Sequence, residues 1–217
     1  MNQTELETRL EAALQQHDDG SDASHDVHHS RRVLANAREI SGREGAGDIR
    51  LLTAAAYLHD LVNLPKDSPQ RAKASQLSAE AAEPILRELG FDEQEIAATK
   101  HIISAHSFSA QIPPQTEEAK ILQDADRMEA LGALGIARTF YVAGKLGSGL
   151  FDGDDPFATD RSPDDKRFAL DHFRLKLLGL ADTMQTGAGR LLAAERTVSI
   201  RRYLDDLSAE IGAENVW

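Results

Sequence analysis

Apolar residues recur at intervals of three and four positions along most of the chain. The clearest stripe consists of Leu6, Leu10 and Leu14, which are spaced by about one helical turn. The same kind of period predicts further helices, which cover residues 28–40, 48–62, 78–91, 92–107, 120–144, 166–184 and 189–212. The alternation of apolar and polar residues that is typical of strands does not occur. The sequence therefore predicts an all-α fold.

Loops interrupt the helical pattern. Residues 108–119, which include Pro113 and Pro114, read as a loop. Residues 63–75 contain Pro65 and Pro69, and residues 145–165 are rich in Gly, Asp and Pro, so both of these read as loops as well. A loop as long as the last one is usually functional or disordered. The segment 145–165 is therefore either a lid over a site or a surface excursion.

One apolar segment ends in a way that a simple core helix would not. The chain is apolar from Leu51 to Leu58 except at Thr53, and then continues directly into His59 and Asp60. Buried polar groups cost free energy unless they are paired or bind a metal. Either the predicted helix reaches the surface at His59, or the interior uses these two side chains.

Composition narrows the possible classes of function. The chain has 217 residues, 41% of them hydrophobic and 28% charged, and a formal net charge of −12. Such an acidic protein is not expected to bind nucleic acid stably through the phosphate backbone. The absence of cysteine excludes disulfides, zinc–thiolate sites, iron–sulfur clusters and cysteine nucleophiles. No segment reads as a signal peptide or a membrane span, so we expect a cytoplasmic protein without a membrane partner.

Histidine and aspartate enter apolar, helical segments at three places: His29, the pair His59–Asp60, and Asp124 or Asp126. A lone His–Asp pair is more often a surface pair or a helix-end hydrogen bond. Two imidazoles and two carboxylates together, however, suit a divalent Mn, Fe, Co, Ni or Zn ion. Asp124 and Asp126 point to nearly opposite sides of a helix, so only one of them should join a common site. Spacing favours Asp126, which shares a face with core residues, but does not decide between them.

The segments "SHDVHHSRRV", "AAYLHDL" and "ILQDADRMEALGALGIAR" resemble the HD superfamily of metal-dependent phosphohydrolases, which is named for an H…HD…D ligand set. The resemblance places the metal ligands at His29, His59, Asp60 and Asp126. Further segments, "HDLVNLPKDSPQRAKAS", "HSFSAQIPPQTEEAKI" and "LFDGDDPFATDR", are similar to small stand-alone bacterial HD hydrolases. The resemblance covers nearly the whole chain. It implies one HD-type domain over residues 1–217, a helical bundle around a single divalent metal, with manganese favoured.

Phosphoryl transfer needs positive charge around the reacting oxygens. The candidate substrate-binding residues, which all lie near the proposed ligands in the sequence, are Arg32, Lys66, Arg71 and Arg127. Lys66 is also a catalytic candidate, together with Asp60 and with His106 as a group for proton transfer. Each has a plainer alternative: a solvated loop charge, an ion pair with a neighbouring helix, or, for His106, a core histidine with satisfied hydrogen bonds.

The sequence departs from the binuclear members of the superfamily, which hold a second ion with extra histidines. Here "SQLSAEAAE" supplies serines where one such histidine would be expected. His101 and His106 lie five residues apart, so at most one should face the site. We therefore expect one metal, which also weakens an oxygenase hypothesis that requires a di-iron centre.

The resemblance implies hydrolysis of a small-molecule phosphate ester by a metal-activated water. The first expectation is cleavage of (deoxy)nucleoside triphosphates to monophosphate and pyrophosphate. A 5′-nucleotidase or phosphomonoesterase is the near alternative. A noncatalytic metal- or nucleotide-binding module and an iron-dependent oxygenase are the alternatives from other classes. Self-association into a homo-oligomer stays open.

Overall fold

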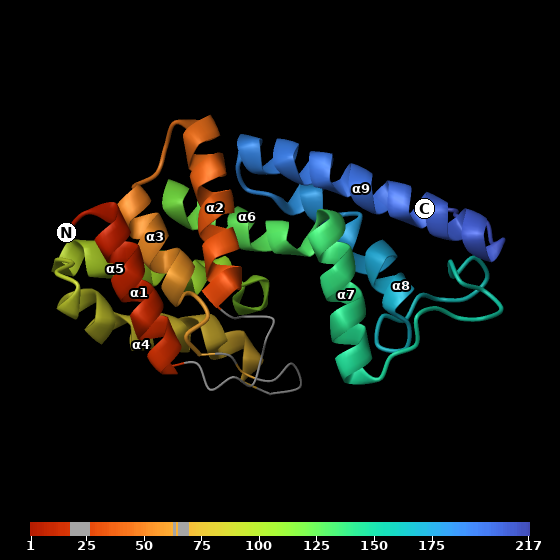
Figure 1. Ribbon diagram of the computed structural model, residues 1–217, viewed down its shortest axis with the longest axis horizontal. Helices are drawn as coiled ribbons and strands as arrows, with labels where there is room; N and C mark the ends of the chain where they lie inside the picture. The colour runs from red at the N-terminus through yellow and green to blue at the C-terminus, as the bar shows by residue number, and fades with distance from the viewer. Residues whose placement is uncertain (18–26, 63, 65–69) are drawn as a thin grey trace. The chain divides into compact units, whose positions relative to one another are not determined.

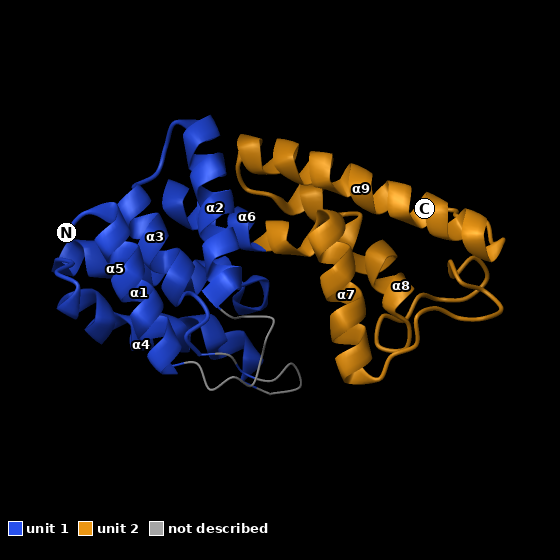
Figure 2. Cartoon of the chain, in the orientation of Figure 1, with its two compact units in different colours: residues 1–126 blue, residues 127–217 orange. Residues whose placement is uncertain are grey.

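The computed structural model describes residues 1–17, 27–62, 64 and 70–217. The chain divides into two compact units, residues 1–126 and residues 127–217 (Figure 2). The described residues form helices and no β-strand beyond a single bridge between Gly149 and Phe168, so the predicted all-α fold is confirmed. The single domain expected over residues 1–217 stays a prediction.

Unit 1 is built around one short buried helix. Its helices are α1 (Gln3–His17), α2 (Val27–Glu44), α3 (Ile49–Leu58), α4 (Ala74–Glu88), α5 (Glu93–His106) and α6 (Glu117–Arg127), with short 3₁₀ turns η1 (Arg71–Lys73) and η2 (Phe108–Ala110). Helix α3 packs against α1, α2, α4 and α5 (Figure 1). Every residue of α3 from Leu52 to Leu58 is buried. The three alanines Ala54, Ala55 and Ala56 present little bulk, so the neighbouring helices can approach closely on all sides.

Helix α3 is capped at its start and ends inside the unit. The Asp48 side chain accepts hydrogen bonds from the backbone N–H groups of Arg50 and Leu51, as an N-cap does. At the other end, His59 is the C-cap residue and is fully buried. The helix therefore does not reach the surface at His59, which removes one of the two explanations for the polar pair.

One carboxylate ties three helices of unit 1 together. Glu11 on α1 accepts hydrogen bonds from Arg31 Nε and Nη2 on α2, both at 2.7 Å, and from the Tyr57 hydroxyl on α3, also at 2.7 Å. Tyr57 is otherwise buried, with 1% of its surface exposed. The Glu11 carboxylate thus satisfies the Tyr57 hydroxyl, the polar atom of this otherwise buried side chain.

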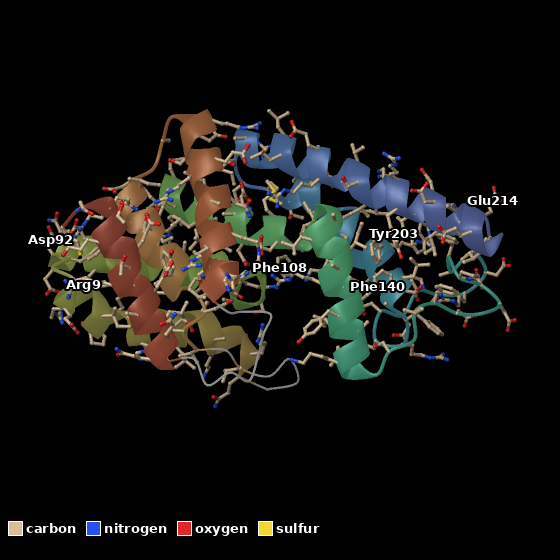
Figure 3. The ribbon with its side chains drawn as sticks, in the orientation of Figure 1. Arg9, Asp92, Phe108, Phe140, Tyr203 and Glu214 are labelled. Carbon is tan, nitrogen blue, oxygen red and sulfur yellow. The ribbon has the colours of Figure 1, made fainter. Side chains whose placement is uncertain are left out.

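Unit 2 contains η3 (Met128–Ala130), α7 (Gly132–Leu146), α8 (Ala169–His172), a π-helix (Phe173–Leu177), η5 (Leu180–Thr183) and α9 (Gly187–Ile211). Helix α9 packs against α7 and η5. The rings of Phe140, Phe173 and Tyr203 lie with their centroids 5.8 to 6.0 Å apart and form an aromatic cluster, in which Figure 3 labels Phe140 and Tyr203.

Two predicted helices are wrong in their continuity. The helix expected over residues 120–144 is interrupted between Arg127 and Gly132, because Leu131 is extended and Gly132 has φ +69°, a left-handed conformation that glycine adopts without strain. The helix expected over residues 166–184 is divided into α8, the π-helix and η5. Local helical periodicity did not reveal either break.

The long loop predicted over residues 145–165 has a fixed internal structure. Asp171 is fully buried, and it accepts hydrogen bonds from Arg161 Nη1 and Nη2 at 2.5 and 2.8 Å and from the Asp164 N–H at 2.6 Å. Asp155 accepts the backbone N–H groups of Thr159, Asp160 and Arg161. Charged groups therefore organise this segment internally, and its action as a lid stays a prediction. No helix in the described ranges has the length and the apolar character needed to cross a membrane.

The Glu11 interactions predict a pH-dependent contribution to stability. The hydrogen bond from Arg31 lowers the pKa of Glu11 below its ordinary value of 4.5, against an opposing effect of burial. A carboxyl whose pKa is lowered by folding stabilises the protein above its unfolded pKa, and this contribution is lost as the pH falls. We expect Glu11→Gln to reduce the free energy of unfolding by about 1 kcal/mol near pH 7.

Urea denaturation at a series of pH values measures this difference. It should stay constant from pH 8 to about 5 and shrink below pH 4.5. A difference that is the same at pH 3 as at pH 7 would contradict the assignment.

Candidate metal centre

Four polar side chains from three helices of unit 1 converge at the end of α3. His29 comes from α2, His59 and Asp60 follow α3, and Asp126 lies near the end of α6. The Nε2 atoms of His29 and His59 lie 3.2 Å apart. Asp126 Oδ1 lies 3.6 Å from the His29 nitrogen, and Asp60 Oδ2 lies 3.4 Å from the His59 nitrogen. The structure therefore brings together all four residues that the sequence suggested as ligands.

His106, the last residue of α5, lies beside this cluster. Its Nε2 atom is 3.6 Å from Asp60 Oδ1, and its ring stands edge-on to the His59 ring with centroids 4.8 Å apart. Two groups of side chains each have their ligand atoms within 4.8 Å of one another: His29, His59 and Asp126, and His59, Asp60 and His106. His101, five residues earlier on α5, belongs to neither group; its Nε2 accepts the Gln115 N–H instead.

Backbone carbonyls orient two of the imidazoles. His59 Nδ1 lies 2.9 Å from the Ala56 carbonyl oxygen, and His106 Nδ1 lies 2.7 Å from that of Ile103. A carbonyl oxygen can only accept, so Nδ1 carries the proton in both rings, and in the neutral form Nε2 keeps its lone pair. This is the outer hydrogen bond that metal-binding histidines usually make.

Burial and charge set the protonation states of the cluster. Burial lowers the pKa of His59 to about 4, despite the nearby Asp60 carboxylate, so His59 is neutral near pH 7. Burial alone would raise the pKa of Asp126, but the neighbouring charges of His59, His29 and His106 outweigh it and lower the pKa. For His106, burial lowers the pKa, but the hydrogen bond to Asp60 and the charges of Asp60 and Asp126 together raise it.

The donor set fits a divalent ion. The imidazoles are buried, whereas 26% of the Asp60 side chain and 30% of the Asp126 side chain are exposed, so the carboxylates form the open side of the cluster. Two imidazole nitrogens 3.2 Å apart need a proton or a cation between them, because two lone pairs at that distance repel. Neutral imidazoles with carboxylates suit Mn, Fe, Co, Ni or Zn, and the geometry does not single out one of them.

Comparisons with known proteins give the cluster a family. The family model described as the HD domain matches residues 26–131. The uncharacterized protein YpgQ of Bacillus subtilis (strain 168) is 33% identical over 193 residues, which cover 87% of this chain and 85% of YpgQ. The chain belongs to the HD superfamily. The resemblance seen in the sequence is thereby confirmed.

Similar solved structures agree with this chain in fold along nearly its whole length. The crystal structure of B. subtilis YpgQ in complex with ADP has a TM-score of 0.74 at 32% identity, with 97% of each chain covered. The structure of an HD-superfamily hydrolase from Bacillus thuringiensis also has a TM-score of 0.74, at 31% identity, with 98% of this chain and 99% of that chain covered.

The choice between the two aspartates of α6 has a clear geometric answer. We call His29, His59, Asp60 and Asp126 together the HD cluster. Asp124, in contrast, is fully buried and lies in neither candidate metal-binding group of the described residues. Asn36 on α2 also donates a hydrogen bond to the Ala125 carbonyl oxygen, at 3.1 Å. This bond joins the two helices that carry His29 and Asp126.

The candidate phosphate-binding residues lie in different parts of the chain. Arg32 lies on α2, three residues after His29. Arg71 begins η1 and donates from Nη1 to the Leu64 carbonyl oxygen. Arg127 belongs to unit 2, where its Nη1 donates to the Thr183 carbonyl oxygen at 2.5 Å and to the Thr183 hydroxyl at 3.2 Å. Lys66 lies outside the described residues.

Two serines of α4 form hydrogen bonds with backbone groups near the site. They lie in the stretch where binuclear members of the superfamily would carry a histidine. Ser78 Oγ on α4 accepts the Val62 N–H at 3.0 Å, two residues after Asp60. Ser75 Oγ donates to the Ser104 carbonyl oxygen on α5 at 2.9 Å. These hydroxyls fix the chain on either side of the cluster, a role that their sequence positions did not suggest.

Sequence reasoning missed one polar residue close to the HD cluster. Gln123 lies one turn before Asp126 on α6, and its Nε2 donates to the Ala105 carbonyl oxygen at 2.7 Å, just before His106. Its Oε1 is buried and accepts no hydrogen bond from the described residues. Gln123 thus links the ends of the two helices that carry Asp126 and His106. Its position directly after the apolar residues Ile121 and Leu122, one turn before the ligand, was the available signal.

The cluster predicts that loss of one buried imidazole abolishes metal binding. His59→Gln removes the nitrogen shared by both candidate groups, so we expect the purified variant to retain less than about a tenth of the ion bound by the wild type. Inductively coupled plasma mass spectrometry after dialysis against Mn²⁺ measures the content. His101→Gln, on the same helix as His106 but outside both groups, is the matched control and should bind as the wild type does. Equal metal content in both variants would rule out the cluster as the metal site.

Proposed function

We propose that the chain is a phosphohydrolase that depends on one divalent metal ion and acts on nucleotides, with cleavage of (deoxy)nucleoside triphosphates to monophosphate and pyrophosphate as its main reaction. The observation that carries the proposal is the HD cluster of His29, His59, Asp60 and Asp126, with its neutral imidazole and open carboxylate side. These four residues would hold a divalent ion, and such an ion would supply a lowered pKa for water and polarisation of a phosphoryl oxygen.

The residues around the cluster supply the remaining requirements of the reaction. His106 lies beside Asp60, and its raised pKa favours a proton on Nε2 near neutral pH, from which it can be passed to a leaving oxygen. The Asp60 carboxylate, whose Oδ1 lies 3.6 Å from this nitrogen, holds the imidazolium in place by its opposite charge. The α5 helix ends at His106, so the ring stands where the chain leaves the packed interior.

Positive charge for the phosphates is proposed to come from the segment after Asp60. Arg71 lies in this segment, at the start of η1, and Lys66 precedes it in the sequence. Both act as counter-charges to the phosphate oxygens in this proposal. Arg127 has a smaller role, since its guanidinium already donates two hydrogen bonds to Thr183.

The nucleotide class is supported by the relatives. B. subtilis YpgQ, which is similar along nearly the whole chain, was solved in complex with ADP. A nucleoside diphosphate combines a base, a sugar and a phosphoanhydride, so carrying that ligand over to this chain points to a nucleotide rather than to a simple phosphate ester. The proposed manganese preference is an extension of the same hypothesis.

The test is hydrolysis of a nucleotide panel by the metal-stripped protein after addition of Mn²⁺. Ion chromatography separates phosphate from pyrophosphate and so identifies the bond that is cut. We expect pyrophosphate from (deoxy)nucleoside triphosphates, and Asp60→Asn should reduce kcat/KM by about two orders of magnitude or more, because a ligand is lost. Asp92→Asn, an exposed N-cap that keeps its acceptor oxygen, is the matched control and should be unaffected.

Other products would lead to other conclusions. Phosphate released from nucleoside monophosphates, without pyrophosphate, would replace the proposed reaction with 5′-nucleotidase activity. Nucleotide binding without turnover in the presence of Mn²⁺, Co²⁺ or Ni²⁺ would replace the enzyme with a binding module. Turnover that requires oxygen and a second bound iron would indicate an oxygenase.

A further inference from the structure

An exposed aromatic side chain lies in the turn that follows α5, close in sequence to His106. Phe108 exposes 72% of its surface, more than any other large hydrophobic residue in the described part of the chain. It follows His106 by two residues, so the two Cα atoms lie within about 7.6 Å of each other. Figure 3 labels Phe108 at the turn that follows α5. Folding normally removes a ring of this size from water, because burial of its apolar surface is favourable.

The backbone holds this ring on a tight, well-fixed turn. Ser107 is extended, with φ −78° and ψ 126°, so the chain leaves α5 immediately after His106. The turn η2 follows and is closed by the Gln111 N–H, which donates to the Phe108 carbonyl oxygen at 3.3 Å. Gln111 has φ +52°, a conformation that is strained for a residue with a side chain. A hydrogen bond of 2.9 Å between the hydroxyls of Ser107 and Ser109 closes the turn further.

The surroundings of the turn are cationic on one side. The η2 turn packs against η1, which consists of Arg71, Ala72 and Lys73, and against the helices α4 and α5. The turn that carries the exposed ring therefore contacts both the basic segment η1 and the helix that ends at His106, beside Asp60. These segments offer an aromatic face and positive charge to a ligand that has a flat part and an anionic part.

We propose that Phe108 stacks against the base of the nucleotide substrate while the phosphates bind at the HD cluster and η1. This inference rests on the proposed function and adds to it the means by which the base is held. Every base presents a π-face, and stacking on an aromatic ring tolerates all of them. The Phe108 side chain has no hydrogen-bonding atom with which to read a base edge. The enzyme therefore accepts all four bases with similar KM values and binds a nucleotide more tightly than inorganic triphosphate.

Kinetics of Phe108→Ala tests this assignment. We expect KM to rise about tenfold for each of dATP, dGTP, dCTP and TTP, with kcat changed by less than about twofold, because stacking is lost while the cluster is kept. The Ki of inorganic triphosphate, as a competitor of dATP, should not change. Phe108→Trp should restore KM. Ile49→Ala is the matched control, since Ile49 is exposed on the same unit but begins α3, at the opposite end from His59.

A binding measurement separates this inference from the proposed reaction. The chain has one tryptophan, Trp217, so Phe108→Trp in a Trp217→Phe background places a single indole at the turn. Circular dichroism checks that this double variant is folded. Quenching of its fluorescence by each nucleotide, but not by inorganic triphosphate, would support stacking even if no nucleotide were hydrolysed.

Three results would overturn the stacking role. They are the absence of quenching by any nucleotide, a Ki for triphosphate that rises together with KM, and a KM effect confined to one base. If the wild type hydrolyses nucleotides in any of these cases, the proposed function stands and only the role of Phe108 is withdrawn. If no nucleotide is hydrolysed and none quenches the indole fluorescence, both proposals fail.

Discussion

The rest of unit 1 is arranged around one close contact. The Nε2 atoms of His29 and His59 lie 3.2 Å apart in its buried interior. Separating the two rings would cost free energy, because both are packed in the interior. His29 and His59 are 1% and 0% exposed, and the Nδ1 of His59 is held by a backbone carbonyl. Burial also keeps the His59 imidazole uncharged near neutral pH, because it lowers the pKa of the ring to about 4. A compact positive charge between the nitrogens is the arrangement that satisfies both lone pairs together with the adjacent carboxylates.

The helices are packed so that this arrangement is stiff. Helix α3 delivers His59 and Asp60 from the centre of the unit because its alanines let four neighbouring helices approach it. The other residues of the cluster are tied to it through backbone contacts: Asn36 joins α2 to α6, and Gln123 joins α6 to the end of α5. A ligand set that is spread over separate helices can keep its distances within the tolerance of a metal site only when such cross-links exist.

The sequence predicted most of the cluster because its signal was an inconsistency between burial and polarity. An apolar run that ends in His59 and Asp60 conflicts with a simple core, and a metal site resolves that conflict. Asp126 could be preferred over Asp124 only weakly from spacing, since both lie in the same helical turn. The resemblance to the HD superfamily strengthened that preference. The role of Gln123 was not predictable, because it depends on where the carbonyl of Ala105 lies in space.

The breaks in the predicted helices have a different origin. Residues 128–131 are good helix formers, so local propensity favours continuity through them. The turn exists because Gly132 adopts a left-handed conformation and Gly135 lies against the Ala130 carbonyl, where an added Cβ would come within 2.2 Å of the oxygen. Only the three-dimensional path of the chain reveals that these two glycines are needed. The same limit applies to the segment after α5, where periodicity indicates a loop but not that its phenylalanine is exposed.

The charge distribution supports the proposed binding mode, in which an ion, a few cations and an aromatic ring share the recognition of a nucleotide. The chain carries a formal charge of −12, so a polyanionic substrate meets a repulsive protein everywhere except where positive charge is concentrated. Among the described residues of unit 1, the HD cluster could hold positive charge as a divalent ion, and η1 carries Arg71 and Lys73. Electrostatics of this kind holds phosphates but does not distinguish a nucleotide from inorganic triphosphate. Discrimination between them requires an uncharged contact with the base, and in the proposed binding mode the aromatic side chain on the turn after α5 provides it.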